Sequence, residues 1–365
     1  VGIYSSPYLE VFNERIEFDG KYITDGELET ITDRVCSAAD KMVSEGKESP
    51  TEFEIVTAIA FLYFKEKGAD YVVLEVGLGG RGDSTNIVKE PLCSVVTSIS
   101  LDHTDRLGET IPEIAMEKAG IIKKGCPVVS GSRDDEAKAV LRKTATDMGA
   151  PFFDAARIVP KVVKSDMKGS VFSAEILGRE HKGINISMAG DYQIDNAVTA
   201  LYAIELLRKQ NKTDITSREI REGMENAKNI GRMEVLNENP WIIIDGAHNP
   251  DGAKSLKTTI EKNFKGKKIL MVLGILADKE VDEVLHMFKD ITLDYVSTCP
   301  QNPRALAAAE LSGKIISMGG NAVTADSPSD AVKIAMGKRD DYDIILFAGS
   351  LYLIGSVRQE IIGLI

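Results

Sequence analysis

Acidic, imidazole and hydroxyl side chains follow several apolar runs of this sequence, at the point where each run ends. They are Glu75, Asp102, His103, Asp245, His248 and Ser350. In open parallel sheets, ligands bind beyond the carboxyl ends of the strands. Any one of these residues alone is most simply a helix cap or a loop residue. Four strand ends of this kind in one chain instead predict a ligand site.

The chemistry that these residue types favour is metal-assisted phosphate chemistry. Glu75 follows the apolar run YVVL, and an acidic residue in this position holds Mg²⁺ in phosphate-loop ATPases. Mg²⁺ prefers one or two carboxylates together with phosphate oxygens and waters. His103 follows the next apolar run, so it is either a ligand of a second ion or a solvated loop histidine. Its place at a neighbouring strand end favours the metal ligand.

A glycine-rich segment after Glu75 matches the residue spacing of a dinucleotide-binding motif. Gly77, Gly79 and Gly82 spell G-x-G-x-x-G, and Asp102 lies 20 residues beyond Gly82 (102 − 82). Only the ten residues DSTNIVKEPL separate Gly82 from the next apolar run. A parallel crossover needs about a dozen residues or more and usually a helix. The spacing therefore disfavours an NAD-dependent oxidoreductase.

Two further segments combine polar residues with a predicted helix start. In DGAHNP, Asn249 has the residue type of a helix N-cap and Pro250 that of a first helical position. This capping pattern gives no reason for Asp245 and His248, which lie between the strand and the helix. Ser350 likewise precedes a predicted helix, and helix N-termini favour anions. The charged run EKAGIIKKG has the composition of a solvated helix end, with Lys118 as the candidate exception.

The elements that must position these residues alternate between short apolar strands and amphipathic helices. We expect strands at 71–76, 93–99, 127–131, 241–245, 267–274, 293–299 and 341–349. We expect helices at 53–68, 191–210 and about 352–361, and a small antiparallel meander at 156–186. The first three strands have the composition of buried, central parallel strands. The βα alternation restarts after Asn229–Gly231, which predicts two α/β domains with largely parallel sheets.

Composition narrows the class of protein. A chain of 365 residues is too long for one ordinary core, and its 43% hydrophobic and 27% charged content is that of a globular protein. The net charge of −12 argues against a nucleic-acid partner. No apolar run approaches the ~20 residues that span a bilayer. The four cysteines are scattered without metal spacing, so we expect reduced thiols and a cytoplasmic protein.

Eight sequence blocks, taken in order, resemble folylpolyglutamate synthases and bifunctional dihydrofolate synthases of the Mur ligase superfamily. They are SSPYLEVFNERI, TEFEIVTAIAF, LEVGLGGRGDSTN, SLDHTDRLGETIPEIAMEKAGIIK, GDYQIDNAVTA, GRMEV, DGAHNPDG and AGSLYLIG. Their order and spacing extend the resemblance from the first residues to about Arg358. It implies an ATPase-type central domain over residues 1–229 and a Rossmann-like glutamate-ligase domain over residues 230–365.

The resemblance also implies a reaction and its reactants. The γ-phosphoryl group of ATP would pass to the carboxylate of a pteroate or folate, and the amino group of L-glutamate would then displace phosphate. ATP and two Mg²⁺ ions are the implied cofactors, and a monomer is the implied assembly. Phosphoryl transfer needs mainly positioning and charge neutralisation.

Residue roles follow from the matching blocks. The resemblance implies that Ser6, Glu75 and His103 hold Mg²⁺. Lys118 in EKAG matches a lysine that is carbamylated in this family, which turns a cation into an anionic metal partner.

Nucleotide and glutamate contacts follow in the same way. Four residues would contact the nucleotide, namely Asn196, Arg232, Gly79 and Gly80. The resemblance places Asp245 and His248 at the ATP or glutamate side of the cleft and Ser350 near the incoming glutamate.

Two departures from the family pattern bear on activity. A phosphate loop of the type G-x-x-x-x-G-K-[ST] precedes the SSPY block in the family and is absent from this sequence. Because Val1 opens within an apparent strand, we expect residues upstream; the alternative is a catalytically silent folate- or nucleotide-binding protein. Tyr8 stands where the family usually has His, which affects any role of that ring nitrogen.

Overall fold

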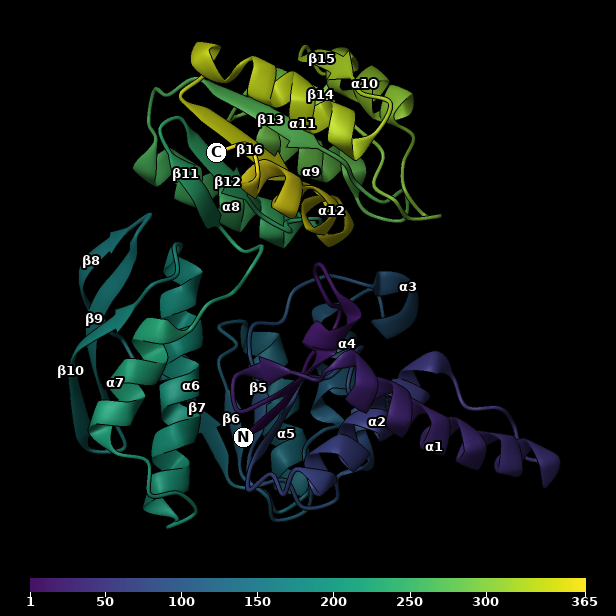
Figure 1. The fold of residues 1–365 in the computed structure, drawn as a ribbon. Helices are drawn as coiled ribbons and strands as arrows, with labels where there is room; N and C mark the ends of the chain where they lie inside the picture. The colour runs from purple at the N-terminus through teal and green to yellow at the C-terminus, as the bar shows by residue number, and fades with distance from the viewer. The chain divides into compact units, whose positions relative to one another are not determined.

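The computed structural model describes residues 1–365, which form two compact units. The first unit comprises Val1–Val128 with Asp134–Phe152, and the second comprises Val129–Arg133 with Phe153–Ile365. Helices alternate with short strands in both units (Figure 1). None of the helices is both long enough and apolar enough to span a membrane.

The first unit contains short strands and five helices. Its strands are β1 (Gly2–Tyr4), β2 (Ile16–Phe18), β3 (Lys21–Tyr22), β4 (Val72–Leu74) and β5 (Ser94–Val96). Its helices are α1 (Asp25–Ser44), α2 (Glu52–Glu66), α3 (Thr104–Leu107), α4 (Ile111–Ala119) and α5 (Asp135–Asp147). One sheet has the order β3-β2-β1-β4. A second sheet has the order β5-β6-β7, with β6 (Val128–Ser130) and β7 (Phe152–Asp154) at the limits of the two units.

Local sequence fixes where the helices of the first unit begin. Each of α1, α2 and α4 starts with a capping box, in which a threonine accepts from the backbone of a glutamate three residues on and that glutamate reaches back. The predicted helix at 53–68 is confirmed as α2, which buries Ile59, Tyr63 and Phe64 in the core below β1. Gly68 follows its end with a positive φ of 64°.

The predicted burial of the first strand is wrong. β4 is the last strand of its sheet and pairs in parallel only with β1, so Val73 is 58% exposed. A parallel strand is buried on both sides only when it has neighbours and covering helices on both. The strands predicted at 93–99 and 127–131 form in shorter versions as β5 and β6. Only β6 is central as predicted, because β5 is at the edge of the order β5-β6-β7 and its Val95 is 38% exposed.

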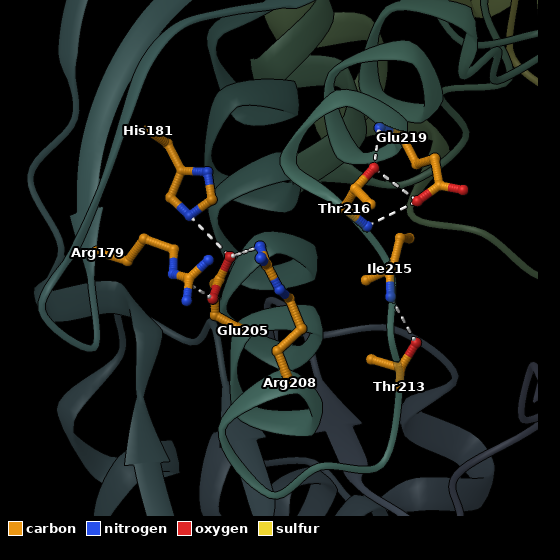
Figure 2. A network of polar contacts seen from close by, with 8 residues as sticks. All are labelled: Arg179, His181, Glu205, Arg208, Thr213, Ile215, Thr216 and Glu219. Atoms are coloured by element: carbon orange, nitrogen blue, oxygen red, sulfur yellow. Dashed lines mark hydrogen bonds and ion pairs between the residues drawn. The ribbon is translucent and has the colours of Figure 1, made fainter.

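The second unit begins with the predicted antiparallel meander. Its strands are β8 (Lys161–Asp166), β9 (Gly169–Ile176) and β10 (Arg179–Ile186), in the order β10-β9-β8. The helices α6 (Asp191–Lys209) and α7 (Ser217–Asn226) pack beside it (Figure 1). His181 and Arg179 of β10 meet Glu205 and Arg208 of α6 in a buried polar network, shown in Figure 2 with the Thr216–Glu219 cap of α7.

A six-stranded sheet completes the second unit. Its order is β11-β12-β16-β13-β14-β15, and all neighbours are parallel except β11 and β12. The strands are β11 (Glu234–Glu238), β12 (Trp241–Ile244), β13 (Ile269–Leu273), β14 (Asp294–Ser297), β15 (Asn321–Thr324) and β16 (Ile344–Ala348). The helices are α8 (Pro250–Asn263), α9 (Val281–Phe288), α10 (Ala308–Ser317), α11 (Pro328–Gly337) and α12 (Leu351–Ile362). All four predicted strands of this region are confirmed, and β11 and β15 are additional.

Helices cover both faces of this sheet, as its nearly unbroken apolar strands require. Apolar residues of α8, α9 and α10 share one core with Ile243, Met271 and Leu346, while α11 and α12 pack together against the sheet. Met167 of the meander belongs to the same core. The compact units therefore differ from the predicted domains, because the meander groups with the C-terminal sheet; the boundary between residues 229 and 230 stays a prediction.

Candidate active site

Ser6 and Glu75 meet because they follow neighbouring parallel strands. β1 and β4 pair with Tyr4 opposite Leu74, so the next residues of each strand leave the sheet at the same edge. The backbone N–H of Ser6 donates to Glu75 Oε2 at 3.0 Å, and Glu75 N donates to Tyr4 O at 2.8 Å. Ser6 and Glu75 therefore lie together, while the metal-binding role that the resemblance implies for them stays a prediction.

The loop after Ser6 is held by a single carboxylate. Glu14 accepts the backbone N–H groups of Leu9, Glu10 and Val11 at 2.7, 2.9 and 2.8 Å. The guanidinium of Arg15 lies 5.3 Å from the ring centroid of Tyr8, within cation–π range. Tyr8, which replaces the usual histidine of the family pattern, therefore packs on Arg15 rather than presenting a ring nitrogen.

A cavity of about 200 Å³ lies beside the residues that follow Glu75. Several of its lining residues are polar or glycine, namely Gly77, Gly79, Ser98, Asp102, His103 and Lys118. All of these except Ser98 are residues that the sequence singled out. They come from different segments, so only the fold brings them to one cavity.

Burial changes the protonation of Lys118. Burial lowers the pKa of Lys118, and the nearby carboxylate of Asp102 opposes that effect without cancelling it. A lysine with a lowered pKa carries more neutral amine at a given pH, because a low-dielectric site disfavours the charged form. The neutral amine is the form that reacts with carbon dioxide to give a carbamate. The environment of Lys118 therefore fits the chemistry that the sequence resemblance implies for it.

Asp102 also fixes the backbone at His103. Its Oδ1 accepts the N–H of His103 at 2.8 Å and lies 3.9 Å from His103 Nε2. His103 has a left-handed backbone, with φ of 51°, immediately before α3. A left-handed non-glycine residue is uncommon and is held by its surroundings. The sequence had singled out Asp102 by its place at a strand end, without assigning it this role of holding the backbone at His103.

The glycine-rich segment packs on α4 rather than forming a dinucleotide fold. Only a short 3-10 helix, Ser84–Ile87, lies between it and β5, so the NAD interpretation stays disfavoured. A side chain at Gly80 would come within 2.9 Å of Glu117 O and 3.1 Å of Lys118 O. Gly80 therefore allows the close approach that places Lys118, while nucleotide contact by Gly79 and Gly80 stays a prediction.

Asp83 pins this segment and was missed from the sequence. Its Oδ2 accepts the N–H groups of Gly77 and Leu78 at 3.0 Å each, and its Oδ1 accepts Thr85 N at 2.9 Å. Aspartate commonly binds backbone N–H groups of its own turn. Its position among glycines was the signal that could have identified it.

In the second unit, the buried carboxylate of Asp245 lies close to the positive charge of Arg232. Asp245 is 5% exposed, and its two oxygens accept Met233 N and Ala247 N at 2.7 Å each. Burial raises the pKa of Asp245, and the positive charge of Arg232 opposes this rise. Burial also raises the pKa of Tyr192, with a further contribution from the negative charge of Asp245. Tyr192 therefore belongs to this cluster, which the sequence analysis did not anticipate.

Loops after β12 and β16 lie together at one edge of the sheet. Gly349 N donates to Ala247 O at 3.0 Å, which joins the segment of His248 to that of Ser350. His248 Nδ1 lies 2.8 Å from Gly246 O. Ser350, only 2% exposed, caps α12 by accepting Tyr352 N at 3.1 Å. The predicted helix after Ser350 is confirmed.

Asn196 lies on α6, one turn beyond Tyr192. Its Nδ2 donates to Gln193 Oε1 at 3.2 Å, and its side chain is exposed. Gln193 in turn contacts Tyr192, whose pKa the charge of Asp245 helps to raise, so these two residues link Asn196 to the Asp245 cluster. The roles predicted for Asn196, Arg232, Asp245, His248 and Ser350 in binding nucleotide and glutamate stay predictions.

The donor set near Glu75 fits Mg²⁺ better than a metal that needs a full protein cage. No group of three or more His, Cys, Asp or Glu side chains in residues 1–365 is placed to hold a metal ion. Mg²⁺ is usually held by one or two carboxylates together with phosphate oxygens and waters. One carboxylate beside Ser6, with His103 at the nearby cavity, therefore suits Mg²⁺ that arrives with a nucleotide.

Comparisons with known proteins agree across nearly the whole chain. The family described as Mur ligase middle domain matches residues 27–204, and Mur ligase, glutamate ligase domain matches residues 231–351. A Bacillus subtilis dihydrofolate synthase/folylpolyglutamate synthase is 37% identical over 99% of this chain and 84% of its own length.

Two solved structures are similar to the chain in fold. A Mycobacterium tuberculosis folylpolyglutamate synthase, solved with ADP and AMPPCP, gives a TM-score of 0.89 at 30% identity, covering 99% of this chain and 84% of its own. The Escherichia coli FolC, solved with DHPP and ADP, gives 0.87 at 30% identity, covering 99% and 81%. The chain therefore belongs to the Mur ligase family, in its branch of folylpolyglutamate and dihydrofolate synthases.

Proposed function

We propose that this protein is an ATP-dependent ligase that joins L-glutamate to dihydropteroate, to reduced folates, or to both, through an acyl phosphate. Membership of the family supports the reaction class. The observation that carries the proposal is the meeting of Ser6 and Glu75 beside a cavity lined by the partly buried Lys118. The nucleotides and the DHPP bound to two relatives are consistent with these reactants.

The residues of the first unit would act on the phosphate side of the reaction. Glu75, Ser6 and His103 would hold two Mg²⁺ ions, which neutralise phosphate charge when bound. Asp83 and Asp102 orient the glycine-rich segment and His103 around the cavity. Lys118, once carbamylated, would supply a negative charge at the same cavity, where its ammonium form would repel a cation.

The residues of the second unit would bind the remaining parts of the reactants. Arg232 and Asn196 would contact the nucleotide, and His248 and Ser350 would contact glutamate. Asp245 stabilises Arg232 and the backbone at Met233, so it acts on binding by positioning its neighbours. A buried, hydrogen-bonded carboxylate of this kind holds a loop more firmly than a solvated one.

Purified protein with ATP, Mg²⁺ and L-glutamate tests the proposal. We expect ADP release that depends on either dihydropteroate or a reduced folate, and comparing the two acceptors identifies the substrate. No ADP release with either acceptor would contradict the proposal. Glu75→Gln should lose most turnover while keeping the fold, because the amide oxygen of Gln can still accept Ser6 N. Near-normal turnover in that variant would remove Glu75 from the proposed metal site.

The catalytically silent alternative has no support from the comparisons, and ADP release would exclude it. A cytoplasmic location and a monomeric state stay predictions from the sequence. The measured mass of the protein in solution tests the second of these.

A further inference from the structure

The segment that carries Arg232 has an unusual backbone. Gly231 and Met233, on either side of Arg232, both have positive φ, at 74° and 46°. For a side chain such as methionine, the left-handed region costs roughly 1–2 kcal/mol and persists only where the surroundings hold it. The Arg232 loop, residues 231–233, is therefore held by neighbouring groups in a conformation that it would not choose alone.

Carboxylates hold this loop at both ends. Asp245 Oδ2 accepts Met233 N at 2.7 Å, and Glu234 Oε2 accepts Gly231 N at 2.9 Å. Gly246 N donates to Gly231 O at 2.8 Å and anchors the loop from β12. A side chain at Gly246 would stand 3.4 Å from Arg232 Nη1, so the guanidinium lies over that glycine. These contacts hold the backbone from which the Arg232 side chain leaves, and the guanidinium lies beside Gly246.

Glu234 is in turn held by Arg358 of α12. Arg358 Nε lies 3.1 Å from both oxygens of Glu234, and Arg358 Nη2 donates to Oε1 at 2.6 Å. The two side chains are only 16% and 19% exposed. A forked, partly desolvated guanidinium–carboxylate pair is stronger and more directional than a surface ion pair. Arg358 therefore leaves Glu234 little freedom to turn away from Gly231.

We infer that Arg358 and Glu234 are positioning residues that aim Arg232 at the bound nucleotide. Neither touches the reacting atoms. Arg358 holds Glu234, Glu234 holds the backbone at Gly231, and the held loop fixes the guanidinium of Arg232. This inference rests on the proposed function, since Arg232 is taken as a nucleotide contact.

Kinetics of the variant Arg358→Met tests the inference. We expect the KM for ATP to rise about tenfold, equivalent to about 1.4 kcal/mol of binding, while kcat changes little. The dissociation constant of ADP, measured by calorimetry, should rise by a similar factor. The matched control is Lys257→Met, which removes another ion pair of this unit whose lysine is 22% exposed. It should leave both constants unchanged.

The charge-swapped double variant, Glu234→Arg with Arg358→Glu, separates positioning from simple stabilisation. It can re-form the ion pair, but an arginine at position 234 cannot accept Gly231 N. Arg358→Met should also lower the melting temperature, because it removes the ion pair. We expect the double variant to restore the melting temperature while its KM for ATP stays raised. Recovery of both would overturn the inference, because the pair would then be only structural.

The same measurements distinguish this inference from the proposed function. If the unmodified protein releases no ADP but Arg358→Met still weakens ADP binding, the proposed function fails and the positioning role stands. If the unmodified protein turns over and Arg358→Met, folded by circular dichroism, keeps its KM for ATP, the positioning role fails alone. Glu234→Gln, which keeps an oxygen for Gly231 N, should weaken ATP binding less than Arg358→Met does.

Discussion

Glu205 and Lys118 are charged side chains whose charges are compensated to different degrees. Glu205 on α6 is 4% exposed, and three cationic or basic side chains reach its carboxylate (Figure 2). Arg208 Nη1 lies 2.8 Å from Oε1, and Arg179 Nε lies 3.4 Å from Oε2. Lys118 is partly buried at its cavity, where one carboxylate, Asp102, is the opposing charge that acts on its pKa.

The difference separates a charge that supports the fold from a charge that supports chemistry. Arginine forks around Glu205 offset the cost of removing it from water, so the network joins β10 to α6. The charge of Lys118 is offset less, and its pKa is lowered as a result. A group in a cavity whose pKa is shifted by desolvation and by a specific charged neighbour is a candidate for function. Four predictions test this contrast.

Lys118→Met should give the largest effect of the four variants, and it should change activity without lowering stability. Loss of the lysine nitrogen should lower kcat by about 10²- to 10³-fold, the usual effect of deleting a positioned charge. The melting temperature should stay the same or rise, because methionine has a similar length and no charge to desolvate. ADP release and thermal unfolding measure the two effects. A large fall in melting temperature with normal kcat would make Lys118 structural.

Glu205→Gln should have the converse result. It leaves Arg208, whose side chain is 15% exposed, without its counter-charge, which typically costs about 3–5 kcal/mol. Urea denaturation measures the lost free energy of unfolding, and the folded fraction should keep its kcat. Unchanged stability would show that the network contributes little to the fold.

The pH dependence of stability should report on His181. Burial lowers the pKa of His181, Glu205 opposes this, and Arg208, Arg179 and Arg221 add to it. His181 Nε2 lies 3.1 Å from Glu205 Oε1 but without hydrogen-bond alignment, as a neutral imidazole allows.

As pH falls below about 6.5, the usual pKa of histidine, the unfolded chain binds a proton that folded His181 does not. The free energy of unfolding should therefore decrease as the pH is lowered. The contribution of His181 to this decrease should level off once the pH is below the pKa of folded His181. The variant His181→Gln should lose this component. Urea denaturation at several pH values compares the two proteins, and identical slopes would contradict the lowered pKa.

Arg133→Gln should have the smallest effect. Arg133 pairs with Asp195 at 2.6 and 3.1 Å, a geometry as good as that of Arg208 with Glu205, but the two side chains are 60% and 42% exposed. Exposed ion pairs contribute at most about 1 kcal/mol. A loss as large as that of Glu205→Gln would show that pairing geometry, rather than burial, decides the contribution.

Much of the fold followed from local patterns. The periodicity of residues 53–68 and 191–210 predicted α2 and α6, and the apolar runs of the C-terminal half predicted β12, β13, β14 and β16. The exposed side of β4 was not predictable, because an edge strand and a central strand can share the sequence YVVL. The short strands β11 and β15 carried too weak a signal to be expected.

The sequence by itself determined which residue types stand at strand ends, because each follows its own apolar run along the chain. It therefore identified Glu75 and His103 as candidates, while Ser6 and the metal-site role of Lys118 came from the resemblance to a known family. Which of them share a cavity, and which charges are left partly uncompensated, was decided only by the tertiary structure. Burial and pairing depend on residues far apart in sequence, such as Arg358 and Glu234, and no local pattern records those contacts.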